Sequence, residues 1–196
     1  MDEHYSQSQP GHRALRKGRV SLGNTAYLVT TTSKNREPLF AHFPAACCAA
    51  RCFDDASLLG PSRMLAWVLM PEHVHWLLQL GDQDSLGKVI GRLKSASSRH
   101  ANRDLNRTGP LWSKAFHDHA LRAEEELQAV ARYIDANPLR AGLLRRVGDY
   151  RFGMPSGFDK ALRWLVSLRS LRGHGPLLPG GAPAKSLFTF VAATGR

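Results

Sequence analysis

The sequence lacks the features that are typical of secreted and membrane proteins. Its three cysteines, Cys47, Cys48 and Cys52, are clustered and odd in number, which argues against a disulfide framework. Paired C-x-x-C motifs are absent, so a structural zinc site is not expected. The apolar run MLAWVLM at 64–70 is too short to span a bilayer, and the polar N-terminus does not resemble a signal peptide. We therefore expect a soluble, cytoplasmic protein.

Acidic residues are also scarce. The 196-residue chain carries 27 Lys and Arg against 16 Asp and Glu, a formal net charge of +11. A charge of this size favours a polyanionic partner, most often nucleic acid. The alternative is a basic protein that is merely kept soluble by its charge. The length suits one folded domain with a substantial core.

The pattern of apolar residues predicts alternating strands and helices. Pro71 and Glu72 split one long apolar stretch, and we interpret the stretch as two strands joined by a tight turn, because proline would break a central strand. Asp84 or Ser85 is expected to cap the helix that follows, and the last helix should end or kink at Asn137-Pro138. The predicted strands are 26–32, 63–70, 73–80 and 111–122, and the predicted helices are 43–59, the segment from 86 to about 103, and 123–137.

This order of elements predicts an α+β protein. The short link between the second and third strands requires an antiparallel pair, and a ferredoxin-like antiparallel sheet with helices packed on one face fits best. The folded domain should span 21–152. We expect residues 1–20 to form a basic N-terminal arm, and residues 153–196 to form an extension that is partly helical and then a Gly/Pro-rich tail.

Two histidines, His73 and His75, stand out within the third predicted strand. Residues i and i+2 of a strand share a face, so the two imidazoles should lie side by side with Val74 on the opposite, packed face. Neutral imidazoles placed in this way can bind one metal ion, although a further ligand is needed. Two half-exposed strand histidines are the alternative, and that reading is favoured for the second H-x-H pair, His117 and His119.

Tyr133 and Asn137 are four residues apart and should lie on one face of the last helix. The simple interpretation is a packed tyrosine ring and an asparagine that caps the helix before Pro138. A tyrosine hydroxyl with a pKa near 10 is a poor nucleophile unless the group that it attacks is activated. A divalent cation nearby would activate a phosphoryl group as a Lewis acid.

Several segments together resemble a known family. VLMPEHVHWLLQL resembles the HUH motif (His, hydrophobic residue, His) of single-tyrosine transposases, and FHDHALRAEEELQAVARYIDANPLRAGLLRRVGDY resembles the nucleophile helix of the REP-associated tyrosine transposases. The segment RKGRVSLGNTAYLVTTTSKNREPLF is similar to the first strand of that family. The resemblance spans about residues 16–150 and implies an HUH endonuclease-like fold. After Tyr150 the sequence departs from the Trp-containing segment that is common in the family.

The resemblance implies a mechanism. His73 and His75 would bind Mg²⁺ or Mn²⁺ with Asn137 as a third ligand, and Tyr133 would attack a single-stranded DNA phosphodiester to give a 5′-phosphotyrosine. The substrate would be a hairpin of the REP (repetitive extragenic palindrome) type, which is cleaved and rejoined by a cytoplasmic, nucleoid-associated monomer or homodimer. A domesticated, non-cleaving protein that binds DNA or RNA hairpins is one alternative. A hydrolase that binds zinc with both H-x-H pairs is another.

Basic side chains are expected to contact the DNA backbone. We expect three tryptophans to be core residues and not platforms for base stacking; they are Trp67, Trp76 and Trp112. The basic residues of the helix that begins at 86 could instead form a plain solvated face; they are Arg92, Lys94, Arg99 and Arg103. The predicted DNA-binding residues are Arg16, Lys17, Arg19, Arg92, Lys94, Arg99, Arg122 and Arg140.

Overall fold

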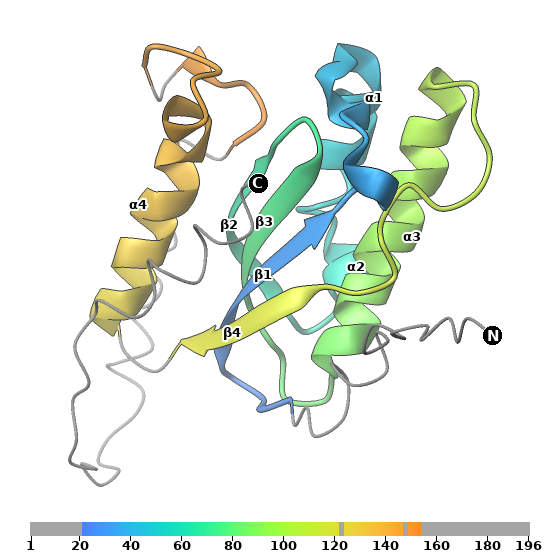
Figure 1. Ribbon diagram of the computed structural model, residues 1–196. Coiled ribbons are helices and arrows are strands. Elements are labelled where there is room, and N and C mark those ends of the chain that lie inside the picture. The colour runs from blue at the N-terminus through green and yellow to red at the C-terminus, as the bar shows by residue number, and fades with distance from the viewer. Residues whose placement is uncertain (1–20, 122–123, 147–148, 154–196) are drawn as a thin grey trace, which may run out of the picture.

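The computed structural model describes residues 21–121, 124–146 and 149–153 (Figure 1). Four antiparallel strands form one sheet in the order β2-β3-β1-β4. This order, with helical connections between β1 and β2 and between β3 and β4, confirms the α+β class and the ferredoxin-like antiparallel sheet. The strands are β1 (Ala26–Thr32), β2 (Arg63–Leu69), β3 (His73–Gln79) and β4 (His117–Leu121).

The central hairpin forms as predicted around Pro71-Glu72. Trp67 pairs with Trp76 across β2 and β3, and the amide of Met70 donates to the carbonyl of His73 at 2.8 Å to close the turn. The last predicted strand, at 111–122, is shorter than expected. The regular strand begins at His117, and the earlier residues pair with the chain at the end of β1 only through an isolated bridge between Ser33 and Trp112. Trp112 is buried there and stacks on Phe40 with ring centroids 4.8 Å apart.

Three helices cover one face of the sheet. They are α1 (Phe43–Ala50), α2 (Ala56–Leu59) and α3 (Leu86–Asp104), preceded by the short 3-10 turns η2 (Lys34–Arg36) and η3 (Leu39–Ala41). Their apolar side chains pack on Val29, Val74 and Trp76. The helix predicted over 43–59 is in fact two helices. Asp55 interrupts it, because its carboxylate accepts a hydrogen bond from the Ser57 amide at 2.8 Å and caps α2.

The remaining helix, α4 (Glu124–Arg140), lies on the opposite face of the sheet (Figure 1). The prediction that all helices pack on one face is therefore incomplete. The strands are apolar on both faces: Leu28, Val68 and Leu77 point away from α3 and would be exposed if α4 did not cover them. The apolar residues of α4 supply that cover, and they are Leu127, Val130, Ala131 and Ile134.

Of the two alternatives predicted for α4 at Asn137-Pro138, an end or a kink, the end is wrong. The helix passes through Pro138 and continues to Arg140. It ends where Gly142 adopts a left-handed φ of 70°. The amide of Gly142 donates to the carbonyl of Leu139 at 3.1 Å, and the amide of Leu143 donates to that of Pro138 at 3.0 Å. These two hydrogen bonds form a Schellman motif, which satisfies the terminal carbonyls of the helix.

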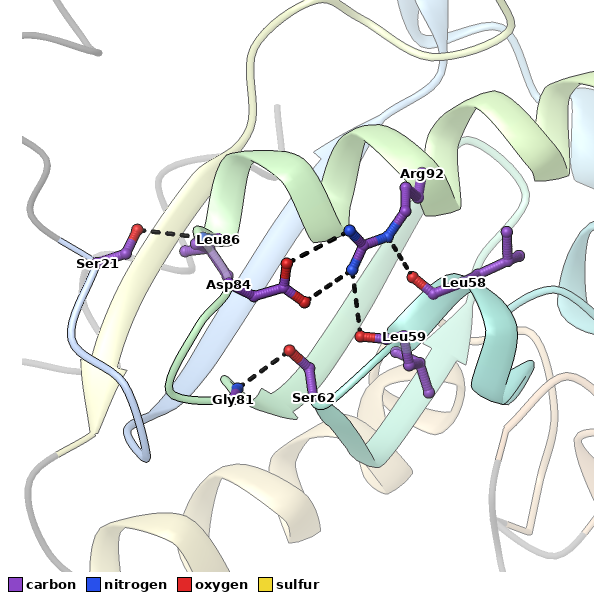
Figure 2. A network of polar contacts seen from close by, with 8 residues as sticks. All are labelled: Ser21, Leu58, Leu59, Ser62, Gly81, Asp84, Leu86 and Arg92. Atoms are coloured by element: carbon purple, nitrogen blue, oxygen red, sulfur yellow. Dashed lines mark hydrogen bonds and ion pairs between the residues drawn. The ribbon is translucent and has the colours of Figure 1, made fainter.

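Arg92 joins α3 to α2 (Figure 2). Its Nε donates to the carbonyl of Leu58 at 2.6 Å, and its Nη2 donates to that of Leu59 at 3.2 Å and to the carboxylate of Asp84 at 2.8 Å. Arg92 was predicted to bind DNA, but these contacts give its guanidinium a structural role at the end of α2. Two further hydrogen bonds in this region join Leu86 to Ser21 and Gly81 to Ser62.

No helix in the described part of the chain is long and apolar enough to cross a membrane.

Candidate active site

The two histidines of β3 share a face of the sheet, as strand alternation predicts. His73 pairs with Thr32 of β1, and His75 pairs with Thr30. The two imidazole centroids lie 4.9 Å apart, and the ring planes are at 82°. This face is not an outer face, because α4 covers it: His75 is only 2% exposed. The pair therefore lies in a partly desolvated site between the sheet and α4.

A hydrogen bond holds one nitrogen of each imidazole. His73 Nδ1 lies 2.7 Å from Glu72 Oε1, and His75 Nδ1 lies 2.8 Å from Thr30 Oγ1. Metal-binding histidines are commonly fixed in this way, with the second nitrogen left to bind the ion. Nε2 is accordingly the atom that each histidine can offer to a metal. Glu72 therefore supports His73 through this contact.

Burial keeps both imidazoles neutral. It lowers the pKa of His75 to about 3, and the neighbouring His73 contributes to that shift. Burial also lowers the pKa of His73, although the hydrogen bond and charge of Glu72 oppose the shift. An imidazole must be deprotonated to bind a metal ion. At neutral pH the pair is therefore in the protonation state that metal binding requires.

Helix α4 places Tyr133 beside the histidines. The centroid of its ring lies 6.0 Å from that of His75, and the guanidinium carbon of Arg140 lies 5.0 Å from the same tyrosine ring. Burial raises the pKa of the Tyr133 hydroxyl, while the Arg140 charge and the Asn137 amide partly oppose the rise. The structure thus brings together a tyrosine and two histidines that are 58 and 60 residues apart in the sequence.

Asn137 lies one helical turn after Tyr133 and is partly buried. Within the described residues its buried Nδ2 has no partner in good hydrogen-bond geometry, although the amide is near enough to the Tyr133 hydroxyl to lower the pKa of that group. The amide nitrogen and oxygen are interchangeable by a half-turn of the side chain. After such a turn the unpartnered atom would be an oxygen, the donor that Mg²⁺ and Mn²⁺ accept. The residue therefore fits the third-ligand position.

The donor set fits a hard divalent ion with an open coordination shell. Among the described residues there is no group of three or more His, Cys, Asp or Glu side chains that could hold a metal. The described residues thus offer two imidazoles and at most an amide oxygen at this site. Such a set leaves positions for water and substrate phosphate, as Mg²⁺ sites commonly do. Its character differs from that of a closed structural zinc site.

The second H-x-H pair does not join the first. His117 of β4 pairs with Thr30, which lies between it and His75. Two strand spacings separate the backbones of these two histidines by roughly 10 Å. His119 lies on the exposed edge, with its Nε2 at 3.4 Å from Glu126 Oε1. This arrangement weighs against a zinc site built from both pairs.

The predicted DNA-binding residues fall into different parts of the molecule. Arg140 lies at the tyrosine site. Lys94 donates from Nζ to the carbonyls of Ser113 and Ala115, each at 2.9 Å, and supports the segment before β4. Arg99 is exposed on α3, on the face of the sheet opposite Tyr133. The others, Arg16, Lys17, Arg19 and Arg122, lie outside the described residues.

The aromatic residues divide clearly between core and site. Trp67, Trp76 and Trp112 are buried at 7%, 0% and 4% exposure, as their interpretation as core residues requires.

Tyr150 was not predicted to lie near the site. Its hydroxyl donates to the carbonyl of Leu69 at 2.6 Å, and burial, together with the nearby Glu72 charge, raises its pKa to about 12. The sequence offered no periodic signal for this contact, because residues 149–153 belong to no helix or strand.

Comparison with known proteins decides the family. Residues 21–137 match the family described as IS200-like transposases, which is more than half of the chain. The chain belongs to the IS200-like transposase family. It is similar to the REP-associated tyrosine transposase of Escherichia coli K12, at 32% identity over 94 residues, which cover 47% of this chain and 53% of that protein. A putative REP-associated tyrosine transposase of Haemophilus influenzae is 28% identical over 102 residues, covering 47% and 58%.

The chain thus spans only a little over half the length of these curated transposases. A solved structure of a REP-associated tyrosine transposase bound to a REP hairpin superimposes with a TM-score of 0.56 at 20% identity, covering 85% of this chain and 95% of that one. At this identity the likeness supports the shared fold. Together these comparisons confirm the resemblance to the REP-associated transposases that the sequence motifs indicated.

Proposed function

We propose that this protein is a metal-dependent transposase that cleaves and rejoins single-stranded DNA at hairpins of the REP type. The observation that supports this function best is the position of Tyr133 on α4, with its ring 6.0 Å from that of His75. His75 and its neighbour His73 are neutral and have Nε2 available for a metal. A nucleophile and a metal-binding pair converge on one partly buried site, which a structural tyrosine would not require.

In the proposed reaction the Tyr133 oxygen attacks the phosphorus of a DNA phosphodiester. A new phosphorus–oxygen bond forms to the tyrosine, the bond to the 3′-oxygen breaks, and the net proton transfer is from the tyrosine hydroxyl to that oxygen. The products are a 5′-phosphotyrosine and a free 3′-OH. Because the pKa of Tyr133 is raised, its hydroxyl is protonated at neutral pH and must lose the proton as the bond forms.

His73, His75 and Asn137 would hold Mg²⁺ or Mn²⁺. Such an ion would supply Lewis-acid activation of the phosphoryl oxygen, which lowers the barrier to attack by a weak nucleophile. Glu72 and Thr30 orient the imidazoles through the hydrogen bonds at their Nδ1 atoms. Arg140, whose guanidinium carbon lies 5.0 Å from the Tyr133 ring centroid, places positive charge where the phosphate would bind.

The hairpin substrate is supported by charge and by likeness. The net charge of +11 suits a nucleic-acid ligand, and the solved transposase with the same fold is bound to a REP hairpin. The histidine pair and Tyr133 are provided by one chain, so a monomer could carry a complete site. We propose that a single copy suffices for cleavage, and that any homodimer forms without exchange of these residues.

Covalent adduct formation tests the proposal. Purified protein is incubated with Mn²⁺ and a hairpin oligonucleotide that has single-stranded flanks, and the adduct is detected by denaturing electrophoresis and mass spectrometry. We expect an adduct with the unaltered protein and with Tyr150→Phe, a control that removes a nearby hydroxyl whose role is structural. Tyr133→Phe should give none.

Two results would contradict the proposal. One is an adduct that persists in Tyr133→Phe, and the other is the absence of any adduct from folded protein with Mn²⁺. If hairpin binding is tight, salt-sensitive and indifferent both to chelator and to Tyr133→Phe, the non-cleaving alternative holds instead. The paired Nε2 atoms and the adjacent tyrosine favour the cleaving enzyme.

A further inference from the structure

The loop between β1 and α1 is fastened beside the histidine pair. The amide of Ser33 donates to the carbonyl of Glu72 at 2.8 Å, and the amide of Phe40 donates to that of Pro71 at 2.9 Å. These bonds anchor both ends of the loop to the β2–β3 turn, directly before His73. In Figure 1 the end of β1 accordingly lies next to that turn. The residues between the anchors are held at the His73 end of the site.

Two of these residues have an unusual backbone. Asn35 and Arg36 have φ values of 58° and 54°, and both side chains are exposed. Left-handed φ is uncommon for residues other than glycine, and arginine gains nothing from it locally. Such conformations persist when the surrounding structure imposes them, and they concentrate at functional sites. Here the backbone conformation determines the direction in which the side chain of Arg36 projects from the loop.

Arg36 lies in the middle of this loop, between the anchors at Ser33 and Phe40, and its side chain is exposed. On the other side of the histidines, Arg140 lies over the Tyr133 ring. The histidine pair is therefore flanked by an arginine from the β1–α1 loop and another from α4.

We propose that Arg36 binds a backbone phosphate of single-stranded DNA at the His73 side of the site, so that the strand crosses the histidine pair between Arg36 and Arg140. This inference rests on the proposed function and adds a substrate-positioning residue to it. Arginine suits the task, because its planar guanidinium is always charged and makes paired hydrogen bonds to phosphate oxygens. A strand held at two points presents its phosphodiester to Tyr133 in a fixed orientation, which is a main source of rate acceleration.

Salt-dependent binding tests the role of Arg36. Tyr133→Phe protein is used as the background, so that the oligonucleotide is not cut, and its Kd for the hairpin with single-stranded flanks is measured over a range of salt concentrations. Each phosphate contact to a single strand contributes about −0.7 to the slope of log affinity against log salt. We expect Arg36→Ala to weaken binding several-fold and to reduce the slope by about that amount.

Arg51→Ala is the matched control. It removes the same charge from an exposed residue at the end of α1, and it should leave the slope unchanged. Arg36→Gly is a second variant that suits the left-handed backbone, so its fold is preserved even if alanine is not tolerated. Arg36→Lys keeps the charge and should retain the slope, but it should slow adduct formation in protein with an intact Tyr133.

The inference fails if Arg36→Ala and Arg36→Gly have the same slope and affinity as Arg51→Ala. That outcome is distinct from a failure of the proposed function, which would appear as missing adduct in the unaltered protein. The binding measurements do not depend on cleavage, so they report on Arg36 in either case.

Discussion

The hydrogen bond between Thr30 and His75 allows a sharp test of how the site is built. Thr30→Val keeps the shape and the strand preference of the side chain but removes the hydroxyl that lies 2.8 Å from His75 Nδ1. Because His75 is 2% exposed, water cannot easily replace the lost partner. An unsatisfied buried polar group costs about 1–3 kcal/mol, so we expect the free energy of unfolding to fall by that amount.

The same substitution should weaken metal binding. Loss of a partner that orients a metal-binding histidine typically lowers metal affinity by about 10- to 100-fold. We expect the Mn²⁺ concentration for half-maximal adduct formation to rise by a similar factor, and Thr30→Ser to restore it. Thr32→Val is the control, because Thr32 lies on the same strand but its hydroxyl bonds to Ser113 at 3.1 Å. Equal Mn²⁺ requirements in Thr30→Val and Thr32→Val would refute the reasoning.

The remaining predictions concern pH and the α2–α3 contact. The folded-state pKa of His75 is lowered to about 3. As the pH falls below 6.5, the imidazole therefore gains a proton in the unfolded state but not in the folded state. The free energy of unfolding decreases as a result. For metal-free protein we expect a loss of about 1.4 kcal/mol between pH 8 and pH 5.5 from this residue, measured by urea unfolding; a pH dependence that is unchanged in His75→Gln would contradict this. Arg92→Ala should lower the free energy of unfolding by about 1–2 kcal/mol without changing the salt dependence of hairpin binding, whereas a reduced slope would restore Arg92 as a DNA contact.

Much of the sheet was predictable, because local patterns determine it. The β-branched run at 26–32 and the apolar runs around Pro71-Glu72 form strands at the expected positions. The same-face placement of His73 and His75 follows from the two-residue repeat of a strand. The stripe on α4 follows from helical periodicity, and its four apolar residues pack as that repeat requires.

What the sequence did not reveal depends on contacts between distant elements. The covering of the second sheet face by α4 is a tertiary arrangement, and the ferredoxin-like pattern alone suggested helices on one face. The last helix was predicted to end or kink at Asn137-Pro138, whereas it continues to Arg140 and the hydrogen bonds at Gly142 determine where it stops. Arg92 and Lys94 were grouped with solvent-facing cations, yet both donate to backbone carbonyls of other segments. Charge in a sequence does not show where its hydrogen-bond partners are.

The placement of Tyr133 on α4 has a consequence for how a strand can enter and leave. The same helix that carries Tyr133, the proposed nucleophile, buries Val130 and Ile134 against Leu28 and Leu77. Moving α4 away from the sheet to admit DNA would expose this apolar layer to water. The helix is therefore not expected to move as a gate. The DNA strand should instead enter and leave along the exposed edge of the site, where the side chains of Arg36 and Arg140 are exposed to solvent. The position of Tyr133 beside the histidines then depends on hydrophobic packing, and a variant that loosens this layer should displace the proposed nucleophile before it unfolds the sheet.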